Sequence, residues 1–431
     1  LTGWLVARFG RRRVLIVSVA TFTATALLCG LATSFEAMIL YRIVQGGSAA
    51  AMVALPQAVI FDTYPRERHA FAQSVWGMAV VVGPAMAPSI GGFISDLYGW
   101  RMAFLMMLPI GTLALTSTVL VVRDAGREEG KRLDWTGFLA LAAAIACMQI
   151  AFDLGNRLDW FDSSSILLLM AAAAAAFYVF VVQCVTARDP FVNLRIFLNR
   201  NYALGLVLVF VYGLLQIAPT VILPPFLRTL KGYPDTLIGI VLAMRGAGMF
   251  LGFILAPHVA RLDPRIGVGV GVSLTVWSGW LMAHLTFDSS MADIAVAGII
   301  QGLGASTFWV PLSTYSFATM PRHLLPQATG IYHLARTFGM SLFVAICVAV
   351  VLWSARITYS ELSPNLSVFN GMLAYPGVTG GWALGTLPQL AGLEAEIGRQ
   401  ALMIGYQNAF LTYAAVAAAV LPLLLLIRPS R

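Results

Sequence analysis

The sequence predicts an all-α polytopic membrane protein, and three observations lead to this prediction. Hydrophobic residues make up 59% of the 431 positions. Only 11% of the residues are charged, whereas a soluble globular chain holds roughly 25%. The mean hydropathy of +0.83 agrees with these two figures. Because apolar stretches long enough to cross a bilayer follow one another along the chain, the spans can be placed directly.

Twelve spans are expected, each a helix that needs about 20 apolar residues. They cover the ranges 14–33, 38–61, 71–94, 102–122, 135–152, 164–186, 202–222, 237–256, 267–286, 292–318, 328–352 and 401–427. An even number of spans places both ends of the chain on the same side of the membrane.

Lys and Arg residues distribute unevenly between alternate connections. One set of connections holds 18 of them and the other holds 6. The positive-inside rule therefore places the richer set, and both ends of this chain, in the cytoplasm. The net charge of +8 reflects this asymmetry. Since no basic and aromatic pattern typical of nucleic-acid binding accompanies the charge, the expected surrounding is the lipid bilayer and no nucleic acid is expected as a partner.

The stretch GMAVVVGPAMAPSIGG at 77–92 differs from an ordinary lipid-facing span. On a helix its small residues and prolines form two adjacent rows: Gly83, Ala87 and Gly91 on one, and Pro84, Pro88 and Gly92 on the other. Small residues four apart permit close approach of another helix, and the prolines remove backbone donors. We expect a helix that packs closely on a partner and bends or rocks against it, as interrupted spans do in transporters.

Several stretches in order resemble the signatures of the major facilitator superfamily. They are GWLVARFGRRRVL at 3–15, LYRIVQGGSAA at 40–50, GPAMAPSIGG at 83–92 and WRMAFLMMLPIG at 100–111. Further stretches resemble its fourteen-span drug/proton antiporter branch, the EmrB/QacA type: DLGNRLDWFDS at 153–163, DPFVNLRIFLNRNYALG at 189–205, QGLGASTFWVPLS at 301–313 and HLARTFGMSL at 333–342.

This resemblance implies a major facilitator fold with twelve visible transmembrane helices of an expected fourteen. The first span and most of the second would be absent. Residues 1–122 would form the remainder of the N-terminal helix bundle, 123–200 a two-helix insertion, and 201–431 the C-terminal six-helix bundle with an external loop at 353–400. That segment is a plain loop or a docking surface for a partner, which in a three-part pump is a periplasmic adaptor leading to an outer-membrane channel.

The function implied is secondary active export across the inner membrane, with protons exchanged for amphipathic drugs or toxic compounds. The stretch at 83–92 resembles a signature associated with antiporters and so favours export over uptake. A dedicated exporter of a siderophore or metabolite and a truncated, non-transporting fragment remain alternatives. No cofactor is expected. A polytopic enzyme or a metal site is disfavoured because the five histidines are dispersed.

Charged residues inside spans are candidates for proton coupling, because each costs at least about 2.5 kcal/mol at the bilayer centre. The resemblance makes Arg42 an arginine implicated in proton transfer. For Arg336, with His333 one turn earlier, a coupling role and a structural hydrogen bond are both open. Arg245 begins RGAGMFLG, for which a packing role is expected. No Asp or Glu lies in mid-span, so the remaining proton sites are Asp62, Asp153 and His333, and the principal carboxylate is expected in the absent first helix.

A loop motif at the start of the chain is expected to act in conformational change. Its residues are Gly3, Arg8, Gly10, Arg11 and Arg12. In the family that this motif resembles, an acidic residue usually stands four positions after the first glycine. In this chain that position is Ala7. We therefore expect the arginines, with Asp62 or Glu67, to form the latch, and the outward-facing lock to be weaker.

The resemblance places a substrate pocket between the bundles, lined by spans 38–61, 202–222 and 292–318. Its candidate residues are aromatic or carry amides: Gln45, Tyr212, Gln216, Gln301, Phe308, Trp309 and Tyr315. Such a lining suits bulky amphipathic or weakly cationic compounds. Packing or anchoring at the membrane interface is the alternative role for these aromatic residues.

Overall fold

The computed structural model describes residues 2–122, 133–260, 263–365 and 387–426, and this part of the chain is helical without a strand. Eleven of its helices are long and apolar enough to cross a membrane. The predicted span 71–94 forms a further helix, α4 (His69–Tyr98), some of whose side chains the structure does not describe. The predicted all-α polytopic fold is thereby confirmed.

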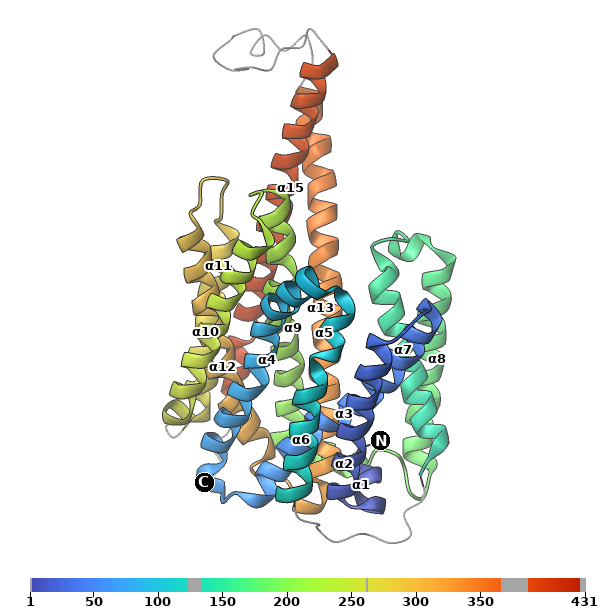
Figure 1. The fold of residues 1–431 in the computed structure, drawn as a ribbon. Coiled ribbons are helices and arrows are strands. Elements are labelled where there is room, and N and C mark those ends of the chain that lie inside the picture. Colours follow the sequence, from blue (N-terminus) through green and yellow to red (C-terminus); the bar gives the residue numbers. More distant parts are fainter. Residues whose placement is uncertain (1, 123–132, 261–262, 366–386, 427–431) are drawn as a thin grey trace.

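The N-terminal part contains six helices (Figure 1). They are α1 (Thr2–Phe9), α2 (Arg11–Gly30), α3 (Phe35–Thr63), α4, α5 (Trp100–Leu105) and α6 (Met107–Val121). Gly10, with φ of 82°, forms the turn between α1 and α2, a conformation strained for any other residue. The predicted span 102–122 is interrupted at Met106 because Pro109 cannot donate to the carbonyl of Leu105.

Two antiparallel helices stand beside these six (Figure 1): α7 (Trp135–Gly155) and α8 (Ser164–Thr186), joined through the 3₁₀ turn η2 (Trp160–Asp162). They occupy the range predicted for the two-helix insertion. Phe152 of α7 packs on Phe338, with 5.8 Å between ring centroids. The connection at 123–132 lies outside the described residues.

The C-terminal part holds the largest hydrophobic cluster of the described chain. Its helices are α9 (Arg200–Thr229), α10 (Asp235–Ala260), α11 (Pro264–Ala283), α12 (Met291–Phe317), α13 (Leu325–Leu362) and α15 (Leu387–Ala418), with 3₁₀ segments η3 (Leu194–Leu198) and η7 (Leu421–Leu426) at its two ends. Helix α12 is the most buried span. A capping box of Ser290 and Asp293 begins this helix and satisfies its first free backbone donors.

Helices α9 and α13 cross at backbone contact. A Cβ atom on Gly213 would overlap the carbonyl of Arg336, and a Cβ atom on Gly339 would overlap the carbonyl of Phe210. Small residues at both positions are what permit this approach. This crossing sets the position of Arg336 along α13 relative to α9, whose Gln216 it contacts.

The expectation that 353–400 is a loop is wrong over much of its length. Helix α13 continues to Leu362, and α15 already begins at Leu387. The two helices extend together beyond the other helices (Figure 1). No glycine or proline interrupts residues 353–362, so α13 continues past the end of the apolar run. Its last turns contact α15, where the Tyr359 hydroxyl donates to Glu394 at 3.5 Å. Residues 366–386 lie outside the described part.

The small-residue row of α4 does not pack as expected. Gly83 and Ala87 are exposed, and among described atoms nothing lies within 4 Å of a Cβ built on Gly83 or Gly91. Contact with α10 occurs instead at Gly77, against the ring of Phe253. Helix α4 therefore meets α10 nearer its first residue. The surroundings of Pro84, Pro88 and Gly92, on the second row, lie outside the description.

Candidate functional site

Two arginine side chains converge on Gln216 in the middle of the C-terminal part. Arg245 of α10 donates from Nη2 to the Gln216 carbonyl at 2.7 Å. Arg336 of α13 donates from Nη1 to Oε1 of the same residue at 3.0 Å. Gln216 belongs to α9, so this one residue joins guanidinium groups from two other helices.

The network continues from Arg245 through Gln301 to the last long helix. Arg245 donates from Nε to Oε1 of Gln301, a fully buried residue of α12. The amide nitrogen of Gln301 donates in turn to the Tyr413 hydroxyl of α15 at 3.2 Å. Five helices thus share one polar chain inside an apolar bundle, where each lost hydrogen bond would leave a costly buried group.

Aromatic rings surround the Arg336 end of this chain. The Arg336 guanidinium lies 5.5 Å from the ring centroid of Trp309, within cation–π range. Tyr212 packs on Trp309 at 5.0 Å between centroids. Trp76 of α4 stacks on Trp309 at 6.2 Å with an interplanar angle of 24°. The N-terminal and C-terminal parts therefore meet at this tryptophan pair.

His333 adds polar atoms that the protein leaves without partners. Its side chain is only 7% exposed, and neither ring nitrogen has a hydrogen-bond partner in the described structure. The ring lies 5.9 Å from Trp76 and 6.1 Å from Trp309. Nε of Arg336 and the hydroxyl of Tyr315 are likewise buried and without a hydrogen-bond partner in the described structure. Buried polar groups are normally satisfied, so these atoms are available to a ligand or water.

The N-terminal candidates are split between the two ends of α3. Arg42 donates to Oε1 of Gln45 at 3.1 Å and covers the ring of Phe104 at 4.7 Å. Asp62 lies 20 residues further along the helix, about 30 Å away at the α-helical rise. The structure does not bring Arg42 and Asp62 together, so they cannot exchange a proton directly.

Asp62 instead joins the loop motif. Arg11 donates to its carboxylate at 2.8 Å, and Arg12 donates to the Val119 carbonyl of α6 at 2.8 Å. Arg8 lies over the ring of Trp4 at 5.4 Å. A Cβ atom on Gly3 would lie 3.2 Å from Gln327 of α13. The motif therefore contacts both bundles, and the acid that faces its arginines is Asp62.

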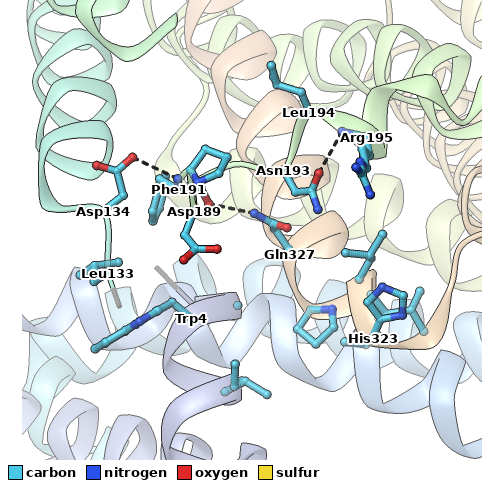
Figure 2. Close-up of a pocket in the computed structure, with 18 of the residues that line it drawn as sticks. Trp4, Leu133, Asp134, Asp189, Phe191, Asn193, Leu194, Arg195, His323 and Gln327 are labelled. Atoms are coloured by element: carbon cyan, nitrogen blue, oxygen red, sulfur yellow. Dashed lines mark hydrogen bonds between the residues drawn. The ribbon is translucent and has the colours of Figure 1, made fainter. Parts of the chain in front are cut away.

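A cavity of about 880 Å³ adjoins this motif. Its lining comes from α1, α3, the residues just before α7, the end of α8, the segment leading into η3 and the start of α13, with Arg11 of α2. Figure 2 shows part of this lining. Asp134 accepts hydrogen bonds from the backbone of Gly137 and Phe191 and from Gln183. Gln327 donates to the Phe191 carbonyl at 2.8 Å. The helix pair α7 and α8 is thereby tied to α13.

The structure unites part of the predicted substrate set and not all of it. Gln216, Gln301, Tyr212, Phe308 and Trp309 belong to the buried cluster. Gln45 is buried beside Arg42. None of the seven candidates, Tyr315 included, lines the 880 Å³ cavity.

Sequence reasoning missed Trp76 and Tyr413 as members of the cluster, and it gave Arg245 only a packing role. An intramembrane charge marks Arg245 as a functional candidate. Nothing in the sequence distinguishes the two aromatic residues from the many others in spans. Their membership depends on contacts between helices far apart in the chain.

Buried arginines among aromatic residues in a polytopic helical bundle mark a functional site inside the membrane. The sequence model of the Major Facilitator Superfamily matches residues 1–344 of this chain. The chain belongs to this superfamily.

Among curated proteins, the chain is similar to two multidrug export proteins named EmrB. That of Haemophilus influenzae is 28% identical over 95% of this chain and 81% of its own length. That of Escherichia coli K12 is 30% identical over 100% of this chain and 85% of its own length. The resemblance to the EmrB type is thereby confirmed.

Among solved structures, the chain is similar to the human organic anion transporter MFSD10, with a TM-score of 0.62 and 13% identity, covering 98% of this chain and 79% of that one. A double-tryptophan mutant of XylE gives a TM-score of 0.60 at 13% identity, covering 100% and 83%. At this identity the two likenesses concern the fold alone, and they confirm the major facilitator architecture.

Proposed function

We propose that this protein exports amphipathic drugs or toxic compounds across the inner membrane in exchange for protons, with both ends of this chain in the cytoplasm. The names of its EmrB relatives support drug export. Residues 1–122 and 201–431 act as the two bundles that rock against each other. Residues 123–200 act as an insertion attached to the second bundle.

The observation that carries this proposal is the cluster where the two bundles meet. Trp76 and Trp309 stack on each other, and Arg336, which donates to Gln216, lies against the Trp309 ring. Aromatic side chains with a few convergent polar groups are the usual lining of a site for small amphipathic ligands. Because the cluster contains residues of both bundles, a ligand bound there would be exposed to one side or the other as the bundles separate.

Proton coupling is assigned to Arg42, Asp62, His333 and Arg336. His333 has two free ring nitrogens beside the fixed positive charge of Arg336. A substrate bound beside this histidine would change how readily the ring takes up a proton, and such a link between the two bound species is what coupled transport requires. Asp62, paired with Arg11, and the glycines and prolines at 83–92 serve the conformational change.

Efflux assays test the proposal directly. The full-length reading frame is expressed in an efflux-deficient host, and resistance is measured over a panel of amphipathic compounds with and without an uncoupler. We expect resistance to several compounds, lost with the uncoupler, and weakened by His333→Asn. The matched control is His284→Asn, at the end of α11, where the ring contacts the Trp280 carbonyl.

Each negative outcome removes a defined part of the proposal. Unchanged resistance for every compound would exclude multidrug export, and efflux that persists with the uncoupler would exclude proton coupling. Resistance to a single metabolite or siderophore would favour a dedicated exporter. A pull-down through the α13–α15 extension that recovers no periplasmic adaptor would exclude the three-part pump.

A further inference from the structure

Within the described residues, the two buried arginines of the C-terminal part have no acidic partner. Of the acidic residues from 201 onward, five lie in a connection or near a helix end: Asp235, Asp263, Asp288, Asp293 and Glu361. The other two, Glu394 and Glu396, lie in the part of α15 that extends beyond the other helices (Figure 1). Arg245 and Arg336 are bonded instead to the neutral side chain and carbonyl of Gln216 and to Gln301. The amides satisfy hydrogen bonds and leave both positive charges uncompensated.

The groups that face the two guanidinium groups from the surrounding helices are neutral. Tyr212 and Tyr413 face Arg245, and Tyr212 and Tyr332 face Arg336. From the N-terminal bundle the cluster receives the indole of Trp76. Two cations held inside a membrane bundle without a carboxylate are expensive, and an anion bound beside them would offset that expense.

The donors left free near Arg336 fit such an anion. Nε of Arg336 and both ring nitrogens of His333 have no partner in the described chain, and a neutral imidazole offers one of its two nitrogens as an N–H donor. A guanidinium edge binds a carboxylate through two parallel hydrogen bonds. Trp76 and Trp309 present stacked rings beside these donors, which suit the apolar body of the ligand. The same molecule can therefore satisfy the charge and the rings.

We propose that the cluster of Arg245, Arg336, His333, Trp76 and Trp309 binds amphipathic organic anions, and that a negatively charged head group is the selective feature of the substrate. This inference rests on the export function proposed above and specifies its substrate class. It replaces the weakly cationic class expected from the aromatic residues, because the joined arginines would repel a cation.

The test uses two fluorescent probes with the same apolar body and opposite charge, 1-pyrenebutyrate and 1-pyrenebutylamine. Binding to the purified chain in nanodiscs is measured by energy transfer from tryptophan. Charge-assisted hydrogen bonds lead us to expect at least about tenfold tighter binding of the anion. Arg336→Gln should remove most of this preference, and Arg336→Lys should keep part of it because the charge remains.

The matched control is Arg228→Gln, in the last turn of α9, where the arginine pairs with the exposed Asp235. Its preference should equal that of the wild type. Equal or tighter binding of the amine by the wild type, or an unchanged preference in Arg336→Gln, would overturn the inference. If Arg336→Gln does not fold, the wild-type ratio and Arg336→Lys decide. A preference abolished by physiological chloride would assign the arginines to an inorganic anion and also overturn it.

The two proposals fail separately. Proton-dependent export without a charge preference would overturn the anion site and leave the export function standing. Selective binding of pyrenebutyrate without proton-dependent transport in proteoliposomes would overturn the export function and leave the anion site standing.

Discussion

At the scale of single residues, Gly213 shows how closely the polar cluster depends on backbone packing. A Cβ atom at this position would overlap the Arg336 carbonyl of α13. Backbone cannot move aside as a flexible side chain can, so Gly213→Ala should separate α9 from α13. We expect a loss of about 1–3 kcal/mol, the usual range for overpacking, measured as a lower unfolding temperature of the purified protein.

The control for this substitution is Gly330→Ala on α13, where a Cβ atom meets nothing within 4 Å among described atoms. Its unfolding temperature should stay unchanged or rise slightly, because alanine favours helix over glycine. Equal destabilisation by the two substitutions would show that helix propensity, not the crossing, decides stability here.

At the scale of elements, Asp134 links the helix pair α7 and α8 to the segment that contacts α13. Its carboxylate begins α7 through Gly137, reaches α8 through Gln183 and holds the segment at Phe191, which Gln327 links to α13. Asp134→Ala removes an N-cap and leaves these donors unpaired, costs of about 0.5–2 and 1–3 kcal/mol respectively. We expect hydrogen exchange around Phe191 to rise by about tenfold or more.

Asp189→Ala is the control for Asp134→Ala. It lies in the same segment and lines the same cavity (Figure 2), and its carboxylate forms no hydrogen bond within the described residues. Exchange near Phe191 should then stay at the wild-type rate. The same rate in Asp134→Ala would show that the insertion is held by its apolar contacts alone.

The elements also show what can be predicted from one sequence. Span positions follow from length and hydropathy, which is why eleven candidate helices match the expected ranges. The break at Met106 and the helical ends of 353–400 did not follow from hydropathy, since the first depends on Pro109 and the second on packing between α13 and α15. Intramembrane charge identified Arg42 and Arg336. The meeting of Arg245, Arg336 and Gln216 was not predictable, because it depends on where three separate helices cross.

At the scale of the whole molecule, transport by rocking requires the two bundles to separate where they now touch. One such contact is Gly77 of α4 against the ring of Phe253 on α10. A cysteine pair at these positions, Gly77→Cys with Phe253→Cys, puts two thiols at this contact. A disulfide forms only when the two Cβ atoms come to about 3.5–4.5 Å, so cross-linking also tests how closely the two helices approach. The four native cysteines are first replaced by serine or alanine so that only this pair can form.

Oxidation of the pair should stop transport, and a reductant should restore it, because the covalent bond holds α4 on α10 and one side of the site stays closed. The control pair is Gly83→Cys with Phe253→Cys. Gly83 lies six residues, or about 9 Å, further along α4, with open space beside it in the described structure, so this pair should neither cross-link nor lose activity. Transport that continues in the oxidised Gly77 pair would mean that α4 and α10 move as one body, and the moving interface would then lie elsewhere between the bundles.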